Sequence, residues 1–169
     1  MAQGDLVQRM LGAATLNIDT YEEVEADETA TLQAGTVVAM VAVASAIGAI
    51  GAGGPSIIFA PISAILGWLL WAGVTYIIGD KLLGGTATWG ELLRTLGFAQ
   101  APGVLYALGI IPILGGFVNF GVWLWMLVAA IIAIRQALDF STGKAVLTAV
   151  LGIIPMIVLY SLFAFLSFL

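Results

Sequence analysis

The chain has 169 residues, of which 62% are hydrophobic and only 9% are charged, whereas a soluble domain needs about 25% charged residues to solvate its surface. The net charge of −5 argues against nucleic acid as a partner and against electrostatic docking on anionic lipid. Because there is no cysteine and no histidine, disulfides, Cys/His zinc sites and imidazole acid–base catalysis are excluded.

The charged residues fall into three short windows that are separated by long uncharged runs. Residues 29–79, 95–134 and 145–169 contain no Asp, Glu, Lys or Arg. A helix needs about 20 apolar residues to cross roughly 30 Å of hydrocarbon, so these runs can hold two, two and one crossings. The sequence therefore predicts an all-α polytopic membrane protein, a bundle of five transmembrane helices that follows a short cytoplasmic N-terminal amphipathic segment.

The N-terminal segment, residues 1–33, precedes a predicted transmembrane domain at 34–169. Residues 4–16 place their apolar side chains on one helical face, with Asp5, Gln8 and Arg9 on the other, which predicts an interfacial helix. Thr20 and Glu23 match a capping box among closely spaced acids, which predicts the start of a helix leading into the membrane. The acidic stretch is either a solvated helix start or a docking surface for a partner.

The spans are separated by breaker residues and by the charge windows. Chargeless hairpins are predicted at 51–55 and 115–121, where glycines cluster. Pro102 and Pro112 are expected to kink span three, and Pro155 to kink or break span five, which makes all three candidate helix breaks. The predicted spans cover about 34–51, 57–79, 97–114, 122–138 and 145–169.

Four tryptophans fall within these spans. Trp68 and Trp71 lie too deep for an interfacial belt, so we expect them to pack inside the bundle. Trp123 and Trp125 follow the second hairpin, where an aromatic belt is expected near the external surface.

The second and third charge windows hold the candidate site. Thr88 and Glu91 form a second capping-box pattern, and Glu91 is also spaced to pair with Arg94. Arg135 and Asp139, four residues apart, have the same potential. Both pairs could equally be surface pairs of little energy. The candidate interaction or structural residues are Glu91, Arg94, Gln100, Pro102, Arg135 and Asp139.

Orientation follows from the positive charges. All five basic residues lie in the three windows, which share one side of the membrane if there are five crossings: Arg9, Lys81, Arg94, Arg135 and Lys144. The positive-inside rule makes that side cytoplasmic. The sequence thus predicts a multi-pass cell-membrane protein with a cytoplasmic N-terminus and an external C-terminus.

No catalytic, cofactor-binding or metal-binding residue is predicted. The sequence contains no P-loop, Gly-x-Ser-x-Gly elbow, HExxH helix or EF-hand pattern. The predicted spans have no ionisable residue at mid-membrane depth, although ion-coupled transporters generally need one. We therefore expect a protein that is not an enzyme.

Several segments together resemble the prokaryotic branch of the Yip1 family. They are the acidic stretch 21–27, Gln33-Ala34, the segment 91–102, the segments around Ile111-Pro112 and Leu114-Gly115, and Trp123-x-Trp125. The resemblance implies a five-helix membrane domain with a cytoplasmic N-terminus. Eukaryotic relatives are linked to Rab-type GTPase binding, vesicle trafficking and membrane shaping. Their Gly-Tyr-x-x-x-Pro pattern is matched by Gly97, Phe98 and Pro102, with Phe in place of Tyr.

Two functions are compatible with these features. The first is a membrane-organising or trafficking-type scaffold whose cytoplasmic elements bind membrane lipid headgroups or a protein partner, with a homo-oligomer left open. The alternative is a small passive transporter or channel that uses backbone carbonyls at the proline breaks of spans three and five.

Overall fold

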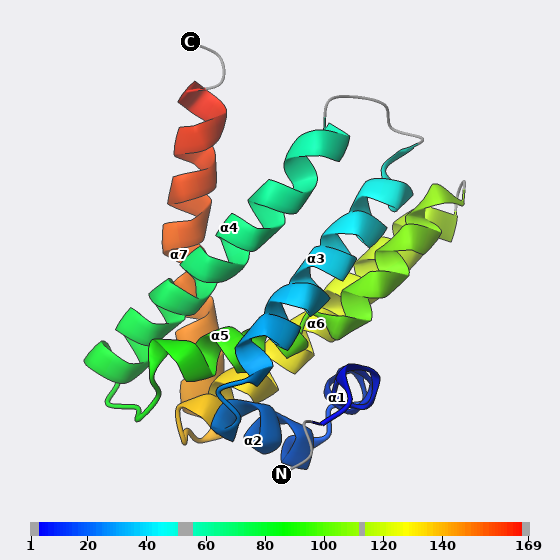
Figure 1. Ribbon diagram of the computed structural model, residues 1–169. Helices are drawn as coiled ribbons and strands as arrows, with labels where there is room; N and C mark the ends of the chain where they lie inside the picture. The colour runs from blue at the N-terminus through cyan, green and yellow to red at the C-terminus, as the bar shows by residue number, and fades with distance from the viewer. Residues whose placement is uncertain (1–3, 51–55, 112–113, 167–169) are drawn as a thin grey trace.

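Every regular element that the structure describes is a helix. The computed structural model describes residues 4–50, 56–111 and 114–166 (Figure 1). The all-α prediction is therefore confirmed for these residues. The elements are α1 (Leu6–Ala14), α2 (Ile18–Ala26), α3 (Ala30–Gly48), α4 (Ser56–Tyr76), the π-helix η2 (Ile77–Leu82), α5 (Trp89–Phe98), the 3₁₀ helix η3 (Ala101–Ile110), α6 (Leu114–Ala137) and α7 (Thr142–Leu166).

Three helical segments within the described residues are long and apolar enough to cross a membrane. They are Ala30–Gly48 in α3, Ala64–Leu82 in α4 and η2, and Leu114–Ala137 in α6. Two shorter apolar helical segments, Ala101–Ile110 and Thr142–Val158, belong to η3 and α7. The membrane-spanning character of the chain is thus supported, while the count of five crossings stays a prediction.

The predicted third span is not one helix. α5 ends at Phe98, and the chain continues after Gln100 as the 3₁₀ helix η3. Pro102 stands in the first turn of η3, where its missing N–H would have no intrahelical partner anyway. Pro102 therefore starts a new helix and does not kink an existing one, which corrects the prediction for residues 97–114.

The predicted hairpin at 115–121 is also wrong, because α6 already begins at Leu114. Gly115 has a packing role: a Cβ there would collide with the backbone of Gly109 in η3. Pro155 lies inside the single helix α7, so the predicted break of span five does not occur there. Pro112 and the hairpin at 51–55 lie outside the described residues.

The long helices rise from a base made of shorter ones (Figure 1). α3, η3 and α6 run side by side, with η3 in contact with both of the others. α4 and α7 rise on the other side, and α5 crosses the base between the two groups. Small residues allow this packing: a Cβ on Gly97 would lie 2.7 Å from the Cβ of Ala34, and one on Gly103 3.1 Å from the sulfur of Met126.

Two of the tryptophans pack as predicted. Trp68 is buried, and its indole N–H donates to the carbonyl of Leu93 at 2.9 Å, which ties α4 to α5. Trp71 is partly buried against the same core. Burying an indole requires a partner for its N–H, and the backbone of α5 supplies one here.

Candidate functional site: a charged cap at one end of the bundle

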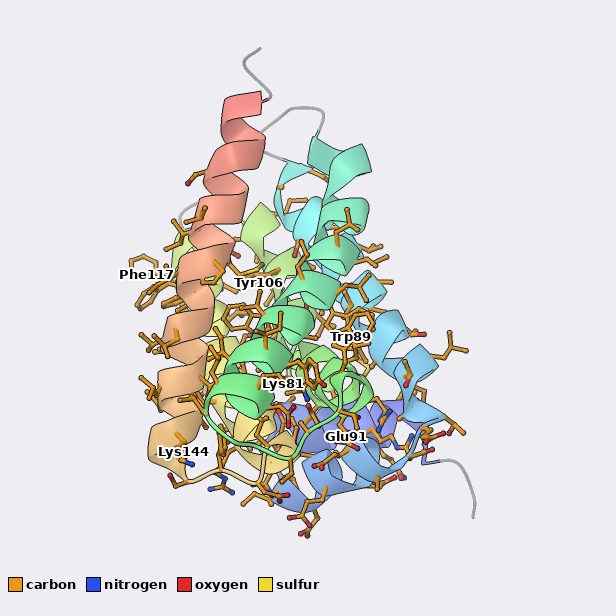
Figure 2. All side chains as sticks on the ribbon, turned by 90° about the vertical axis from the view of Figure 1, so that its left-hand side faces the viewer. Lys81, Trp89, Glu91, Tyr106, Phe117 and Lys144 are labelled. Carbon is orange, nitrogen blue, oxygen red and sulfur yellow. The ribbon has the colours of Figure 1, made fainter. Side chains whose placement is uncertain are left out.

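The three charge windows meet at one end of the molecule. We call this end the cap: α1, α2, the turn 27–29, α5, residues 83–88 and residues 138–144. Figure 2 shows the nitrogen and oxygen atoms of the side chains concentrated there, with Glu91 and Lys144 at this end and Phe117 higher on the bundle. The windows also touch directly, since the Gln136 amide donates to Glu22 at 2.8 Å and the Thr86 hydroxyl to Asp139 at 2.7 Å.

Arg9 is the most buried charged side chain of the cap. It is only 3% exposed and connects three helices through one guanidinium group. Its Nη2 donates to Glu23 at 2.8 Å and to Asp27 at 2.6 Å, and its Nη1 donates to the Gln33 side chain at 2.9 Å. Glu23 belongs to α2 and Gln33 to α3, so Arg9 fixes α1 to both. A buried arginine without partners would strongly destabilise the fold, so these contacts are what allow Arg9 to be buried.

Asp27 completes this cluster. It accepts from the amide and the hydroxyl of Thr29 at 3.0 and 2.6 Å, just before α3 begins. These bonds from Thr29, together with the ion pair to Arg9, lower the pKa of Asp27 to about 2. The carboxylate therefore stays charged and holds the turn between α2 and α3.

Arg94 is the second buried arginine, and it binds the C-terminal end of α2. Its Nε donates to the carbonyls of Val24 and Glu25, at 3.0 Å each, and its Nη2 also donates to Glu25. These carbonyls lie in the last turn of α2, where the carbonyl oxygens of a helix have no N–H partners within the helix. A positive charge at this position also complements the helix dipole. Arg94 thus docks α2 onto α5.

The predicted pair between Glu91 and Arg94 does not form. Glu91 accepts from the amide of Thr88 at 2.7 Å, and its own amide donates to the Thr88 hydroxyl, so the predicted capping box is confirmed. The box turns the carboxylate of Glu91 toward the start of α5, whereas Arg94 points to α2. Three-residue spacing allowed a pair, but each side chain has a stronger partner elsewhere.

Arg135 and Asp139 likewise do not pair in the structure. Arg135 donates to the side chain of its neighbour Gln136 at 2.8 Å. Asp139 lies beyond the end of α6 with φ of 52°, a left-handed conformation that Asp tolerates. Because Asp139 is outside the helix, the i, i+4 geometry that predicted the pair does not apply.

The N-terminal capping prediction is wrong as well. α2 begins at Ile18, and Asn17 caps it by accepting from the amide of Asp19 at 2.9 Å. Thr20 and Glu23 are therefore helical, and Glu23 is bound to Arg9. The chain turns between α1 and α2 at Leu16, which has a φ of 63° and directly precedes Asn17.

Glu25 is a carboxylate in an unfavourable position. Burial raises the pKa of its side chain to about 7, and the negative charges of Glu91, Asp139 and Glu22 act in the same direction, while Arg94 opposes them. The cap therefore carries one acid that titrates near neutral pH.

Gln100 joins α5 to η3 at the inner edge of the cap, and its carbonyl accepts from Gly103 at 2.7 Å.

The described residues contain no group of three or more His, Cys, Asp or Glu side chains that could hold a metal ion. The carboxylates of the cap are instead used as hydrogen-bond acceptors and ion-pair partners.

The geometry of the cap and the helices can be compared with known proteins. Residues 18–166 match the family model of the Yip1 domain. The chain belongs to the Yip1 domain family. The resemblance expected from the sequence is confirmed. The apolar helices of the chain and its family together make the protein a membrane protein. No curated protein and no solved structure matches the chain.

The Yip1 domain as matched includes α2, α5 and Arg94, whereas α1 and Arg9 precede it. Sequence reasoning missed the role of Arg9, which it placed on the polar outer face of an interfacial helix. The signal that could have revealed it is an isolated arginine close to an excess of acids, with Glu23 on α2 and Asp27 just beyond its end.

Trp125 is a further residue whose position differs from the prediction. Its indole N–H donates to the carbonyl of Ala14 at 2.8 Å, in the last turn of α1. Trp125 therefore contacts the cap and not the opposite surface where the aromatic belt was predicted. Its side chain is 40% exposed and lies on α6, among other exposed apolar residues.

Proposed function

We propose that this protein is a non-enzymatic, membrane-organising scaffold of the cell membrane whose cap contacts a protein partner in the cytoplasm. The observation that carries the proposal is the use made of the two buried arginines. Arg9 and Arg94 bind groups of the cap itself and join α1, α2, α3 and α5 into one rigid unit. A rigid unit at the end of a membrane bundle suits a contact surface better than a site that must open for substrate.

The proposed topology has five crossings, with α3, α4, η3, α6 and α7 as the spans. All three charge windows lie at the cap, and two crossings between successive windows return the chain to the same side. All Lys and Arg residues of the chain are in these windows, so the positive-inside rule supports a cytoplasmic cap and N-terminus and an external C-terminus.

The charge of the cap indicates the chemistry of the partner. Its exposed side chains include Asp19, Glu22 and Glu28 on α2 and the following turn. The two buried arginines are already paired, so the exposed surface of α2 is acidic. This favours a Lys- or Arg-rich protein segment and disfavours anionic lipid headgroups, since like charges repel.

Packing around Pro102 supports the scaffold over a passive transporter. Pro102 and its neighbours Ala101 and Gly103 are buried, and a Cβ on Gly103 would meet the side chains of Val41 and Met126. A groove along α3 is lined by Gly35, Ala39 and Trp68, and a second by Ala39, Val43 and Val104. Both are mainly apolar and open, and neither is lined by Pro102 or Pro155.

The test compares the full-length protein with a variant in which the acidic surface is neutralised: Asp19→Asn, Glu22→Gln and Glu28→Gln. Both are placed in bilayer discs of neutral lipid, and binding of a fluorescent Lys-rich peptide is measured at increasing salt. Wild-type binding that weakens with salt and is lost in the variant is expected. Equal binding by both proteins would contradict an acidic docking surface.

A control variant removes charge elsewhere with two substitutions and leaves the net charge unchanged. Asp80→Asn and Lys81→Ala alter the charges in η2 and leave α2 intact. Solute uptake into vesicles is measured in parallel. Uptake above that of protein-free vesicles would favour the transporter and contradict the proposed scaffold.

A further inference from the structure

α1 lies across the ends of the long helices. In Figure 1 it is seen nearly along its axis at the lower end of η3 and α6, while those helices run across the picture. In Figure 2, a quarter turn away, α1 and α2 lie across the base of the bundle. A helix that is perpendicular to membrane spans, at their ends, has the orientation of a helix in the membrane interface.

The surface of α1 divides into three arcs. Arg9 and Ala13 are buried against the protein. Val7 and Leu11 are 57% and 61% exposed, although both are apolar. Gln8 is also exposed and lies on the third arc. The polar side chain that would best bind lipid phosphate, Arg9, is thus turned inward, and an apolar arc is left without protein cover.

The last four carbonyls of α1 all accept hydrogen bonds from groups of the protein. The carbonyl of Leu11 accepts from the amide and hydroxyl of Thr15, and that of Gly12 accepts from Asn17. The carbonyl of Ala13 accepts from the Tyr21 hydroxyl at 3.0 Å, and the carbonyl of Ala14 accepts from Trp125. Full pairing of a helix end is what a low-dielectric surrounding requires.

Trp125 also fixes where α1 lies around the bundle. It projects from α6, a helix long and apolar enough to span the membrane, and its neighbours Leu124 and Val128 are 46% and 40% exposed. The exposed apolar arc of α1 is therefore continuous with the lipid-facing surface of α6. The Trp125 indole thereby anchors the C-terminal end of α1 to the side of α6.

From these observations we propose that α1 is a monolayer-embedded helix: Val7 and Leu11 insert into the leaflet on the cap side, at the boundary of headgroups and acyl chains. The occupant of this face is lipid. Because Arg9, the basic residue of α1, is bound to Glu23 and Asp27, insertion depends on apolar contact and not on the charge of the headgroup. This inference does not depend on which partner the cap binds.

The chain contains no cysteine, so single cysteines can be introduced without background labelling. Val7→Cys and Leu11→Cys report on the apolar arc, Gln8→Cys reports on the polar arc of the same helix, and Thr15→Cys reports on the exposed residue that follows it. Each full-length variant carries a nitroxide label in phosphatidylcholine vesicles, with and without phosphatidylglycerol. The accessibility of each label to oxygen and to a water-soluble nickel chelate is measured.

Labels at 7 and 11 are expected to favour oxygen over the chelate, at a depth of about 5–10 Å, while labels at 8 and 15 favour the chelate. The depth should not change with phosphatidylglycerol. Equal chelate accessibility on both arcs would overturn the proposal. So would low accessibility to both reagents at 7 and 11, because protein would then cover this face. Two positions on the apolar arc and two exposed polar reference positions keep the comparison valid if one variant does not fold.

Discussion

Substitution of Arg94 by alanine tests the docking of α2 most directly. Arg94 is 6% exposed, and its guanidinium supplies the donors for two carbonyls in the last turn of α2, Val24 and Glu25. Hydrogen bonds from a charged donor contribute about 1.5–3 kcal/mol, and buried acceptors left unpaired add a desolvation cost. We expect α2 to lose about 3 kcal/mol of local stability, which makes its opening about 100-fold more frequent.

Hydrogen exchange of the α2 amides, measured in detergent micelles or bilayer discs, reports this opening. Arg94→Lys keeps the charge without the planar fork and should show an intermediate effect. Lys81→Ala is the matched control: it removes a positive charge from the same end, but Lys81 is bound to Asp80 on its own element. If α2 exchanges at the same rate in Arg94→Ala and Lys81→Ala, the docking role of Arg94 is refuted.

Three further predictions concern packing, pH and α1. Gly48→Ala should lower the free energy of unfolding by about 1–3 kcal/mol, because the new Cβ would collide with the Tyr106 carbonyl in η3; Gly116→Ala, with open space around it, should not destabilise. Thermal unfolding measures both. The pKa of Glu25 is raised from 4.5 to about 7, so the folded state binds its proton more tightly and stability should fall as pH rises from about 5 to 8. We expect the free energy of unfolding to change by about 1–2 kcal/mol over this range, and Glu25→Gln should abolish the change. In Arg9→Gln, α1 should be cleaved by protease earlier than α2, because the ion pairs of Arg9 to Glu23 and Asp27 are lost.

Each of these has an outcome that contradicts it. Equal melting temperatures for Gly48→Ala and Gly116→Ala would mean that α3 and η3 are not in contact at Tyr106. A pH dependence that survives in Glu25→Gln would assign the titration to another group. Simultaneous cleavage of α1 and α2 in Arg9→Gln would show that α1 has no separate attachment.

Charge placement alone predicted much of the architecture. The three windows do meet at one end, and the capping box of Thr88 and Glu91 is present as predicted. Both features are local or follow from simple partition of charge between water and lipid. The break between α5 and η3 was less predictable, because a continuous apolar run has the same composition whether the helix is α or 3₁₀.

The errors at the candidate site have a common physical cause. Spacing rules compare a side chain only with neighbours on its own helix. Arg94 instead binds carbonyls 69 and 70 residues away, and Arg9 binds side chains on two other helices. Similarly, Gly115 resembles a turn glycine in sequence, although its small size is used for the close approach of η3 and α6. Contacts made by folding at long range leave no periodic trace.

The 3₁₀ geometry of η3 has a consequence for the surrounding lipid. Its ten residues rise about 2.0 Å each and cover about 20 Å, whereas the 24 residues of the adjacent α6 cover about 36 Å at 1.5 Å each. In the proposed five-span topology, the apolar girdle is therefore lower beside η3 than beside the neighbouring α6. Lipids beside η3 should be compressed and lipids beside α6 extended, so that a single molecule imposes a thickness gradient on the bilayer it occupies.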